Sequence, residues 1–429
     1  MNILYIIPGS GDSFYCGNCL RDSNYVGAVR DLGHNVVKIP MYLPLFSDEN
    51  DMNNIPLFYG AISIYLKQLY PFLRKAPAWF DRLMNSKPML KLAARMSGST
   101  RAKGLGELTV SMLMGEHGEQ REELDRMVTW IADHCKPDII HLSNALLLGL
   151  AGRIKEKLNV PIVCSLQDEN VWVDVMKPTF RDRAWELMRE DAEQVDLFIP
   201  VSDFYGGVMQ EKMNLPADKV KRIHLGVCLA DYPSSTVESK GRNIGFISRM
   251  NPENGLDILV DAFLLLKQEN GFEDVSLVLT GGSTGDDAKF IKSNRKKLAR
   301  AGLLKYVDFH EDFVNAGRME FFKKISVLSV PVRLGEAFGL YLLEAMASGI
   351  PVVQPALGAF PEIIGITGGG FTYQENTPEN LADSLMKILE DKELLKQKSL
   401  NARQGTDDHF NLKKQAGKMI DVYNSVKLS

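Results

Sequence analysis

The strongest constraint on the fold is a repeated alternation of short apolar runs with helix-length stretches. The runs at residues 2–7 and 36–39 flank a glycine-containing turn and a helical pattern that extends to Leu32. A strand–helix–strand unit of this kind joins parallel strands. Because parallel strands are covered by helices on both faces, the alternation predicts an α/β protein with parallel sheets.

The alternation runs through the N-terminal half and resumes after a polar segment. Further strands are expected at residues 138–141, 160–165, 197–201, 243–248, 276–280, 307–309, 325–330 and 351–353. Residues 233–242, with the sequence PSSTVESKGR, are polar and turn-rich, as in a linker between domains. We therefore expect an N-terminal domain over residues 1–232, a C-terminal domain over 243–406 and a final segment over 407–429.

A segment from about residue 45 to 118 interrupts the alternation of strands and helices. It shows no strand pattern and contains amphipathic stretches broken by prolines, which predicts a helical insertion that acts as a lid or specificity module. The chain has a net charge of −4, yet residues 61–103 contain nine Lys or Arg against Asp81 alone. Aromatic residues among these charges suit a membrane surface or a lipid-linked phosphate. A helical lid with a solvated basic face would have the same composition.

Several classes of protein are disfavoured by the composition. The longest uncharged run, residues 345–361, contains glycines and prolines and cannot span a membrane. The N-terminus lacks the basic region of a signal peptide, and five cysteines in 429 residues do not form a secreted disulfide framework. These features predict a cytoplasmic protein, and the acidic balance argues against nucleic acid as a partner.

Metal and redox chemistry find little support in the sequence. Cys16 and Cys19 form a single Cys-x-x-Cys motif, but no second motif supplies the other ligands of a structural zinc. No Asp-x-Asp motif is present, and no histidine pair has metal-ligand spacing, so His134 and His141 are expected to be structural. We predict no metal site.

The most informative segment is residues 335–349, GEAFGLYLLEAMASG. Glu336 precedes a predicted helix, and Gly339 would let a ligand approach the helix start, where free N–H groups favour an anion such as a diphosphate. Glu344 follows about 12 Å further along the helix axis. Two carboxylates flanking an anion site suit a nucleotide-sugar. Taken alone, however, the segment fits better with a first-turn acid and a solvated glutamate.

Three other positions are candidates for the same site. Arg249 follows an expected strand, where its guanidinium could hold phosphate oxygens, although a surface ion pair explains it equally well. Arg333 is close enough in sequence to Glu336 to face the same anion. Gly11 lies in a glycine-rich turn that could line the site from the N-terminal domain, but this turn lacks the Lys and Ser/Thr of a phosphate loop.

Together these residues resemble glycosyltransferase family 4, a family of retaining enzymes with the GT-B fold. The resemblance is strongest over residues 243–364, which include Glu336-x7-Glu344 and the glycine turn at residues 280–282, and it is looser in the N-terminal half. It implies two Rossmann-like parallel-sheet domains that face a cleft, with the helical insertion in the first domain. It also implies that residues 407–429 pack back on the N-terminal domain.

The resemblance assigns roles to individual residues. Glu336 would bind donor-sugar hydroxyls near the reacting carbon, Glu344 would hold the ribose, and Arg249 would steady the diphosphate. Backbone N–H groups of Phe338, Gly339 and Leu340 would bind sugar or phosphate oxygens. Such families work without a metal or other cofactor and transfer the sugar with retention.

Two positions depart from the family pattern. Asn254 stands where the family usually has a lysine, which removes a cation from the diphosphate site. Gln167 stands where it often has a histidine near the sugars, and an amide can hydrogen-bond a hydroxyl but cannot titrate. We hypothesise that Arg333 replaces the missing lysine charge.

The sequence thus predicts transfer of a sugar from a UDP-, GDP- or ADP-sugar to a hydroxyl of a carbohydrate, lipid-linked or small-molecule acceptor. Residues 61–103 would make peripheral contact with the inner membrane face. The alternatives are a sugar-nucleotide epimerase or hydrolase, a non-catalytic sugar-nucleotide-binding protein, and a scaffold that docks on membranes through the basic segment.

Overall fold

A computed structural model describes residues 1–8, 17–41, 58, 105–232, 240–310, 312 and 316–427. The chain forms two compact units. Residues 1–223 together with 416–429 make the first, which we call the N-terminal domain, and residues 224–415 make the second, the C-terminal domain. Gly11, Cys16 and the basic segment 61–103 lie outside the described residues.

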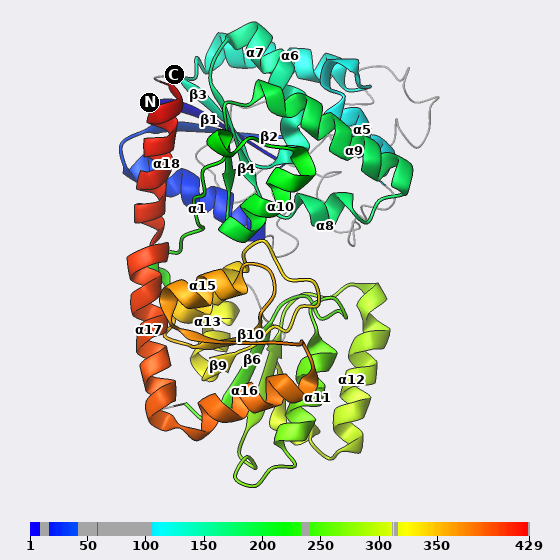
Figure 1. Ribbon diagram of the computed structural model, residues 1–429, viewed down its shortest axis with the longest axis vertical. Helices are drawn as coiled ribbons and strands as arrows, with labels where there is room; N and C mark the ends of the chain where they lie inside the picture. The colour runs from blue at the N-terminus through cyan, green and yellow to red at the C-terminus, as the bar shows by residue number, and fades with distance from the viewer. Residues whose placement is uncertain are drawn as a thin grey trace. The chain divides into compact units, whose positions relative to one another are not determined.

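The N-terminal domain contains a five-stranded parallel sheet with the strand order β2-β1-β3-β4-β5 (Figure 1). Strands β3 and β4 are buried along their whole length, because helices cover both faces of the sheet. The strands are β1 (Asn2–Ile7), β2 (Asn35–Pro40), β3 (Ile139–Leu142), β4 (Ile162–Leu166) and β5 (Leu197–Pro200).

The α-helices of this domain are α1 (Gly17–Asp31), α5 (Gly106–Leu113), α6 (Arg121–His134), α7 (Ala151–Leu158), α8 (Glu169–Val173), α9 (Pro178–Asp191), α10 (Asp203–Met213) and most of α18 (Leu412–Lys427). Short 3-10 turns are η3 (Gly115–His117), η4 (Ala145–Leu150), η5 (Ala192–Gln194) and η6 (Ala217–Lys219). Of the expected insertion, the structure describes Phe58, α5 and η3, and these described parts contain no strand.

The C-terminal domain contains a six-stranded parallel sheet with the order β11-β10-β9-β6-β7-β8. Its strands are β6 (Asn243–Ile247), β7 (Ser276–Thr280), β8 (Val307–His310), β9 (Val327–Leu328), β10 (Val352–Pro355) and β11 (Gly370–Tyr373). Its α-helices are α11 (Leu256–Leu266), α12 (Ala288–Arg300), α13 (Ala316–Lys324), α14 (Leu340–Ala347), α15 (Phe360–Thr367), α16 (Pro378–Glu390) and α17 (Lys392–Phe410). Its 3-10 turns are η7 (Leu229–Asp231), η9 (Gly285–Asp287) and η10 (Leu304–Tyr306).

The strand order fixes where a ligand site can form in each domain. In the N-terminal sheet the direction of winding reverses between β1 and β3, and in the C-terminal sheet it reverses between β6 and β9. Ligands of open α/β sheets bind outside the carboxyl ends of the strands at such a reversal. The loops that follow β3, β6 and β9 are therefore the places to look for function.

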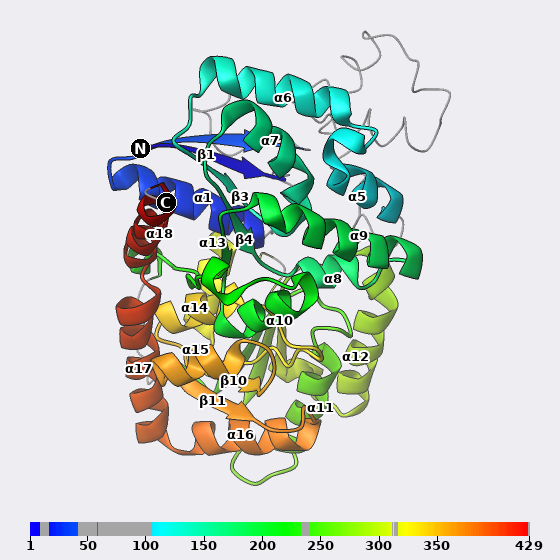
Figure 2. The same ribbon diagram turned by 45° about the horizontal axis from the view of Figure 1, so that its top comes forward.

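The last helix belongs to the N-terminal domain. The Tyr423 hydroxyl lies 2.6 Å from His141 Nδ1, and Lys427 Nζ donates to Asp138 at 2.8 Å. Both views show α18 beside α1, close to the start of β1 (Figures 1 and 2). The helical pattern expected from residue 407 is split, because α17 continues to Phe410 and Asn411 is extended before α18 begins.

Candidate functional site

The first candidate region is the carboxyl edge of the C-terminal sheet, where glycines let three loops pack closely. A Cβ on Gly255, after β6, would lie 1.9 Å from the Pro331 oxygen, after β9. A Cβ on Gly335 would lie 2.6 Å from the nitrogen of Gly358, after β10. Both glycines have positive φ, 73° and 77°, a conformation that L-residues rarely adopt. The loops can meet only because these positions carry no side chain.

Glu336 lies in the loop between β9 and α14 and is half-buried. Its Oε1 accepts a hydrogen bond from the Tyr341 hydroxyl at 3.0 Å, and its main-chain oxygen accepts from Ala359 N–H. A Cβ on Gly339 would lie 3.3 Å from Glu336 Oε2. The carboxylate thus lies close to the start of α14, and its contact with a donor sugar stays a prediction.

The start of α14 suits an anion. Its N-cap is Gly339, with φ 86°, and no described side chain caps the helix. The N–H groups of a first helical turn lack partners within the helix and carry the positive end of its dipole. Phe338 packs its ring against His224 and Phe410 inside the domain, so only its backbone is placed to contact a ligand.

Glu344 is placed differently from the sequence-based picture of a solvent-facing ligand. It is 1% exposed. Its Oε1 accepts from Arg318 Nε at 2.9 Å and from the Tyr232 hydroxyl at 3.0 Å, while Oε2 forms an ion pair with the other arm of Arg318. Arg318, on α13, is itself only 5% exposed. In this conformation the carboxylate is the internal counter-ion of Arg318, and its contact with a ribose remains a prediction.

Arg249 leaves the end of β6 and turns toward the loop after β7. Its Nε donates to Asp287 Oδ2 at 2.9 Å and its NH2 donates to the Thr284 hydroxyl at 2.9 Å. The Arg249 guanidinium and the hydrogen bonds from Thr284 lower the pKa of the Asp287 carboxyl, against the opposing effect of burial. Arg249 therefore stands at the expected edge of the sheet, but it is already paired with a carboxylate.

Asn254 and Arg333 are both engaged by neighbouring groups. The Asn254 amide donates to the Ser248 hydroxyl at 2.8 Å and to the Arg249 oxygen at 3.0 Å, so it fixes the loop where the resemblance expects a lysine. The Arg333 guanidinium donates to Asp257 at 2.8 and 3.1 Å. The expectation that Arg333 turns toward the anion near Glu336 is thus not met in this conformation, because the Asp257 carboxylate on α11 attracts its charge.

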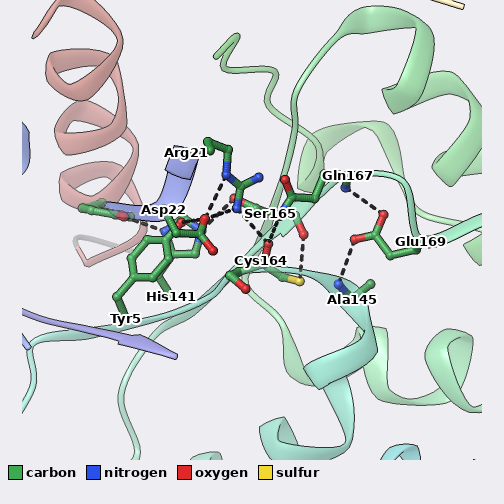
Figure 3. Close-up of polar contacts among 11 residues, drawn as sticks. Tyr5, Arg21, Asp22, His141, Ala145, Cys164, Ser165, Gln167 and Glu169 are labelled. Atoms are coloured by element: carbon green, nitrogen blue, oxygen red, sulfur yellow. Dashed lines mark hydrogen bonds and ion pairs between the residues drawn. The ribbon is translucent and has the colours of Figure 1, made fainter. Parts of the chain in front are cut away.

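The second candidate region is the carboxyl edge of the N-terminal sheet (Figure 3). Gln167 follows β4, is 4% exposed, and donates from Nε2 to the Ser143 oxygen at 2.9 Å. Ser143 follows β3 and is fully buried. Among the described residues, neither Gln167 Oε1 nor Ser143 Oγ has a hydrogen-bond partner. Buried polar atoms without partners are uncommon in native proteins, and a bound water or ligand is one way to satisfy them.

A buried charged pair that sequence reasoning missed lies beside Ser143. Arg21, on α1, forms an ion pair with Asp22 and donates to the Ser143 oxygen at 3.1 Å. Both ring nitrogens of His141 are engaged: Nδ1 lies 2.6 Å from the Tyr423 hydroxyl, and Nε2 lies 2.8 Å from the Ser165 hydroxyl. These contacts fit the structural role that we expect for this residue. Burial and the nearby Arg21 charge lower the pKa of His141 well below its usual value, so the ring is neutral.

Neither a metal-ligand cluster nor a membrane-spanning helix is found in the described parts of the chain. No group of three or more His, Cys, Asp or Glu side chains there could hold a metal ion. Within the same residues, no helix has both the length and the apolar character that crossing a bilayer requires.

Comparisons with known proteins find similarity in both domains. Residues 114–231 match the family model described as "Glycosyltransferase Family 4", and residues 241–391 match "Glycosyl transferases group 1". The chain superposes along 99% of its length on the Anabaena protein HepE in complex with UDP, with a TM-score of 0.68 and 18% sequence identity. It superposes similarly on sucrose-phosphate synthase from Thermosynechococcus elongatus, with a TM-score of 0.69 and 17% identity.

The chain has the GT-B fold. Part of each domain matches a glycosyltransferase family model, residues 114–231 mainly in the first domain and residues 241–391 in the second.

Curated relatives match over part of their length. The mannosyltransferase LpsB of lipopolysaccharide core biosynthesis from Rhizobium meliloti is 28% identical over 43% of this chain and 51% of its own. A D-inositol 3-phosphate glycosyltransferase from Streptomyces griseus is 30% identical over 42% of this chain and 38% of its own. A phosphatidyl-myo-inositol mannosyltransferase from Mycobacterium leprae is 27% identical over 47% of this chain and 50% of its own. The chain thus spans between 38% and 51% of the length of these relatives.

Proposed function

We propose that this protein transfers a sugar from a nucleoside-diphosphate sugar to an acceptor hydroxyl, without a metal ion and with retention at the anomeric carbon. The observation that carries the proposal is the placement of Glu336. Its carboxylate is held by Tyr341 over the uncapped, glycine-started helix α14, at the reversal point of the C-terminal sheet. The diphosphate would bind the helix start, and Glu336 would accept hydrogen bonds from sugar hydroxyls.

The charges around this site support a donor held mainly by backbone groups. Arg249 is paired with Asp287, and Arg333 with Asp257, so these four groups add no net charge. The diphosphate charge would be balanced by the α14 N-terminus and by Arg249 sharing its guanidinium between Asp287 and phosphate. Glu344 would reach the ribose after a change of its contacts with Arg318.

The transfer step would need no cofactor, because every bond broken and every proton released has a partner among the two substrates. The bond between the anomeric carbon and the diphosphate oxygen breaks, and the acceptor oxygen forms a bond to the same face of that carbon. The acceptor proton passes to the departing phosphate oxygen. Gln167 would act on the sugar side by accepting a hydrogen bond from a hydroxyl at its unpartnered Oε1, since an amide cannot take the proton itself.

The first test is a thermal-shift panel of UDP-, GDP- and ADP-sugars, because a ligand that binds only the native state raises the melting temperature. The donor identified in this way is then incubated with carbohydrate and polyol acceptors, and the anomeric configuration of the product is read by NMR. Glu336→Gln should retain the fold and lose turnover by at least about a hundredfold, the scale for removing a transition-state contact. Unchanged turnover in this variant would contradict the proposal.

A non-catalytic sugar-nucleotide-binding protein is the second candidate, and the fixed Asn254 amide favours it. Asn254→Lys places a cation at the position where the family has one. If the protein only binds its ligand, this variant should bind the nucleotide-sugar more tightly and still show neither transfer, epimerisation nor hydrolysis.

A further inference from the structure

Glu169 makes an unusual set of contacts at the carboxyl edge of the N-terminal sheet. It is the first residue of α8 and only 1% exposed. Its Oε1 accepts from Ala145 N–H at 2.9 Å, and its Oε2 accepts from Gln167 N–H at 2.7 Å and from the Tyr205 hydroxyl at 2.7 Å. The two backbone contacts are visible in Figure 3. Burial raises the pKa of this carboxyl, while the hydrogen bonds oppose the shift.

These contacts join the loop after β3 to the loop after β4. Ala145 begins η4, two residues after Ser143, and Gln167 immediately follows β4. The backbone bends sharply between Gln167 and Glu169. Asp168 has φ 57°, in the left-handed region, and this lets the Glu169 carboxylate fold back to the Gln167 N–H. One carboxylate therefore fixes the separation of the two loops.

The residues held by this bridge are the ones with unpartnered buried atoms. Gln167 Oε1 can accept a hydrogen bond, and Ser143 Oγ can donate and accept one. The Gln167 amide is oriented by its donation to the Ser143 main-chain oxygen, which brings the Gln167 side chain next to Ser143. A hydroxyl group both donates and accepts, which matches this pair.

We propose that Glu169 is a positioning residue that holds Gln167 and Ser143 together as a binding pair for one hydroxyl of a sugar or polyol. This inference deepens the proposed function, on which the identity of the ligand rests. Glu169 acts through the two loops and need not touch the ligand. A purely structural alternative would make Glu169 matter for stability alone.

Glu169→Gln is the sharpest perturbation, because all three groups that face the carboxylate are donors. An amide keeps the size of the side chain but turns an NH2 group toward at least one of them. Tyr205→Phe is the matched control, since it removes one donor and leaves both backbone bridges. Gln167→Ala removes the proposed ligand contact without changing the bridge and covers the case in which Glu169→Gln fails to fold.

Two measurements on the full chain test the proposal. Hydrogen exchange followed by mass spectrometry reports the backbone bridge, and Glu169→Gln should speed exchange in peptides containing Ala145 and Gln167, whereas Tyr205→Phe should not. Saturation-transfer NMR with D-mannose and with myo-inositol reports hydroxyl binding. The signal should fall about fivefold to tenfold in Gln167→Ala and Glu169→Gln, as expected for one lost hydrogen bond, and persist in Tyr205→Phe.

The outcomes separate this inference from the proposed function. Equal saturation transfer in all variants, or none in the wild type, overturns the hydroxyl-binding pair, and unchanged exchange in Glu169→Gln overturns the bridge. Absence of nucleotide-sugar turnover in the wild type would overturn the proposed function, yet both measurements above would still decide the role of Glu169.

Discussion

Removing the Glu344 carboxylate gives the most direct test of the C-terminal site, because the structure predicts a large effect on stability. In Glu344→Ala the guanidinium of Arg318 loses its buried partner, and Tyr232 loses its acceptor. Breaking one side of a buried ion pair costs about 3–5 kcal/mol, since an uncompensated charge is left out of water. Burial of the pair therefore predicts a loss of stability in Glu344→Ala in addition to any loss of activity.

The assay is urea denaturation and thermal denaturation of the full chain, each followed by intrinsic fluorescence and repeated with nucleotide present. For a domain of roughly 200 residues, 1 kcal/mol corresponds to about 2–4 °C, so the melting temperature should fall by about 6–20 °C. Arg318→Met combined with Glu344→Leu should recover most of the stability, because an apolar pair of similar size needs no counter-ion. If the double variant is stable but no longer binds the nucleotide, Glu344 has both roles.

Tyr232→Phe is the control for the hydrogen bond alone. It should cost about 1.5–3 kcal/mol, as for a hydrogen bond to a charged group, and leave the Arg318 pair intact. A change in unfolding free energy of less than about 1 kcal/mol in Glu344→Ala would refute the reasoning, because such a small loss is typical of an exposed pair.

Three other predictions concern separate parts of the molecule. Gly339→Ala should lower donor affinity about tenfold or more. The added Cβ would lie 3.3 Å from Glu336 and 3.0 Å from Phe360, and the φ of 86° is strained for alanine. Calorimetry with the donor measures the affinity, and an unchanged value would count against the site. The neutral, buried His141 binds a proton more readily in the unfolded chain than in the folded one, so stability should fall as the pH drops below about 6.5, by up to about 1.4 kcal/mol per pH unit. Urea midpoints at two pH values in the wild type and in His141→Gln measure this, and an equal pH slope in both would rule out the histidine as the cause. The basic segment 61–103 should sediment with anionic vesicles at low salt and release at high salt, and the same segment with its Lys and Arg changed to Gln should stay in solution; sedimentation of both would exclude a charge-driven contact.

Most of the described fold follows from local patterns in the sequence. Apolar runs bounded by glycine and proline locate β1, β2, β4 and β6 to within a few residues, because a buried parallel strand needs apolar side chains on both faces. The short β9 is an exception, since only Val327–Leu328 of the expected 325–330 run makes ladder contacts. The strand β11 has no such signal, because half of its four residues are not buried.

The candidate sites were predictable in part. The places of Glu336 and Gly339 in the fold follow from one loop and one helix start, where local geometry decides the outcome, and their roles in binding stay predictions. Arg318 was missed because its partner is 26 residues away and nothing in the residues around it shows that it is buried. Glu169 gave a weak signal as an acid shortly after a strand, but the donors that surround it come from three separate segments.

The sequence by itself determined the alternation of strands and helices, the glycines that let loops meet, and the acidic residue at the start of α14. These are properties of neighbours along the chain, which periodicity and backbone preference control. Only the tertiary structure decided which charges are paired, because Arg249, Arg333 and Glu344 each take partners from other elements. Burial gives such pairs their energy, and burial depends on how the whole domain packs.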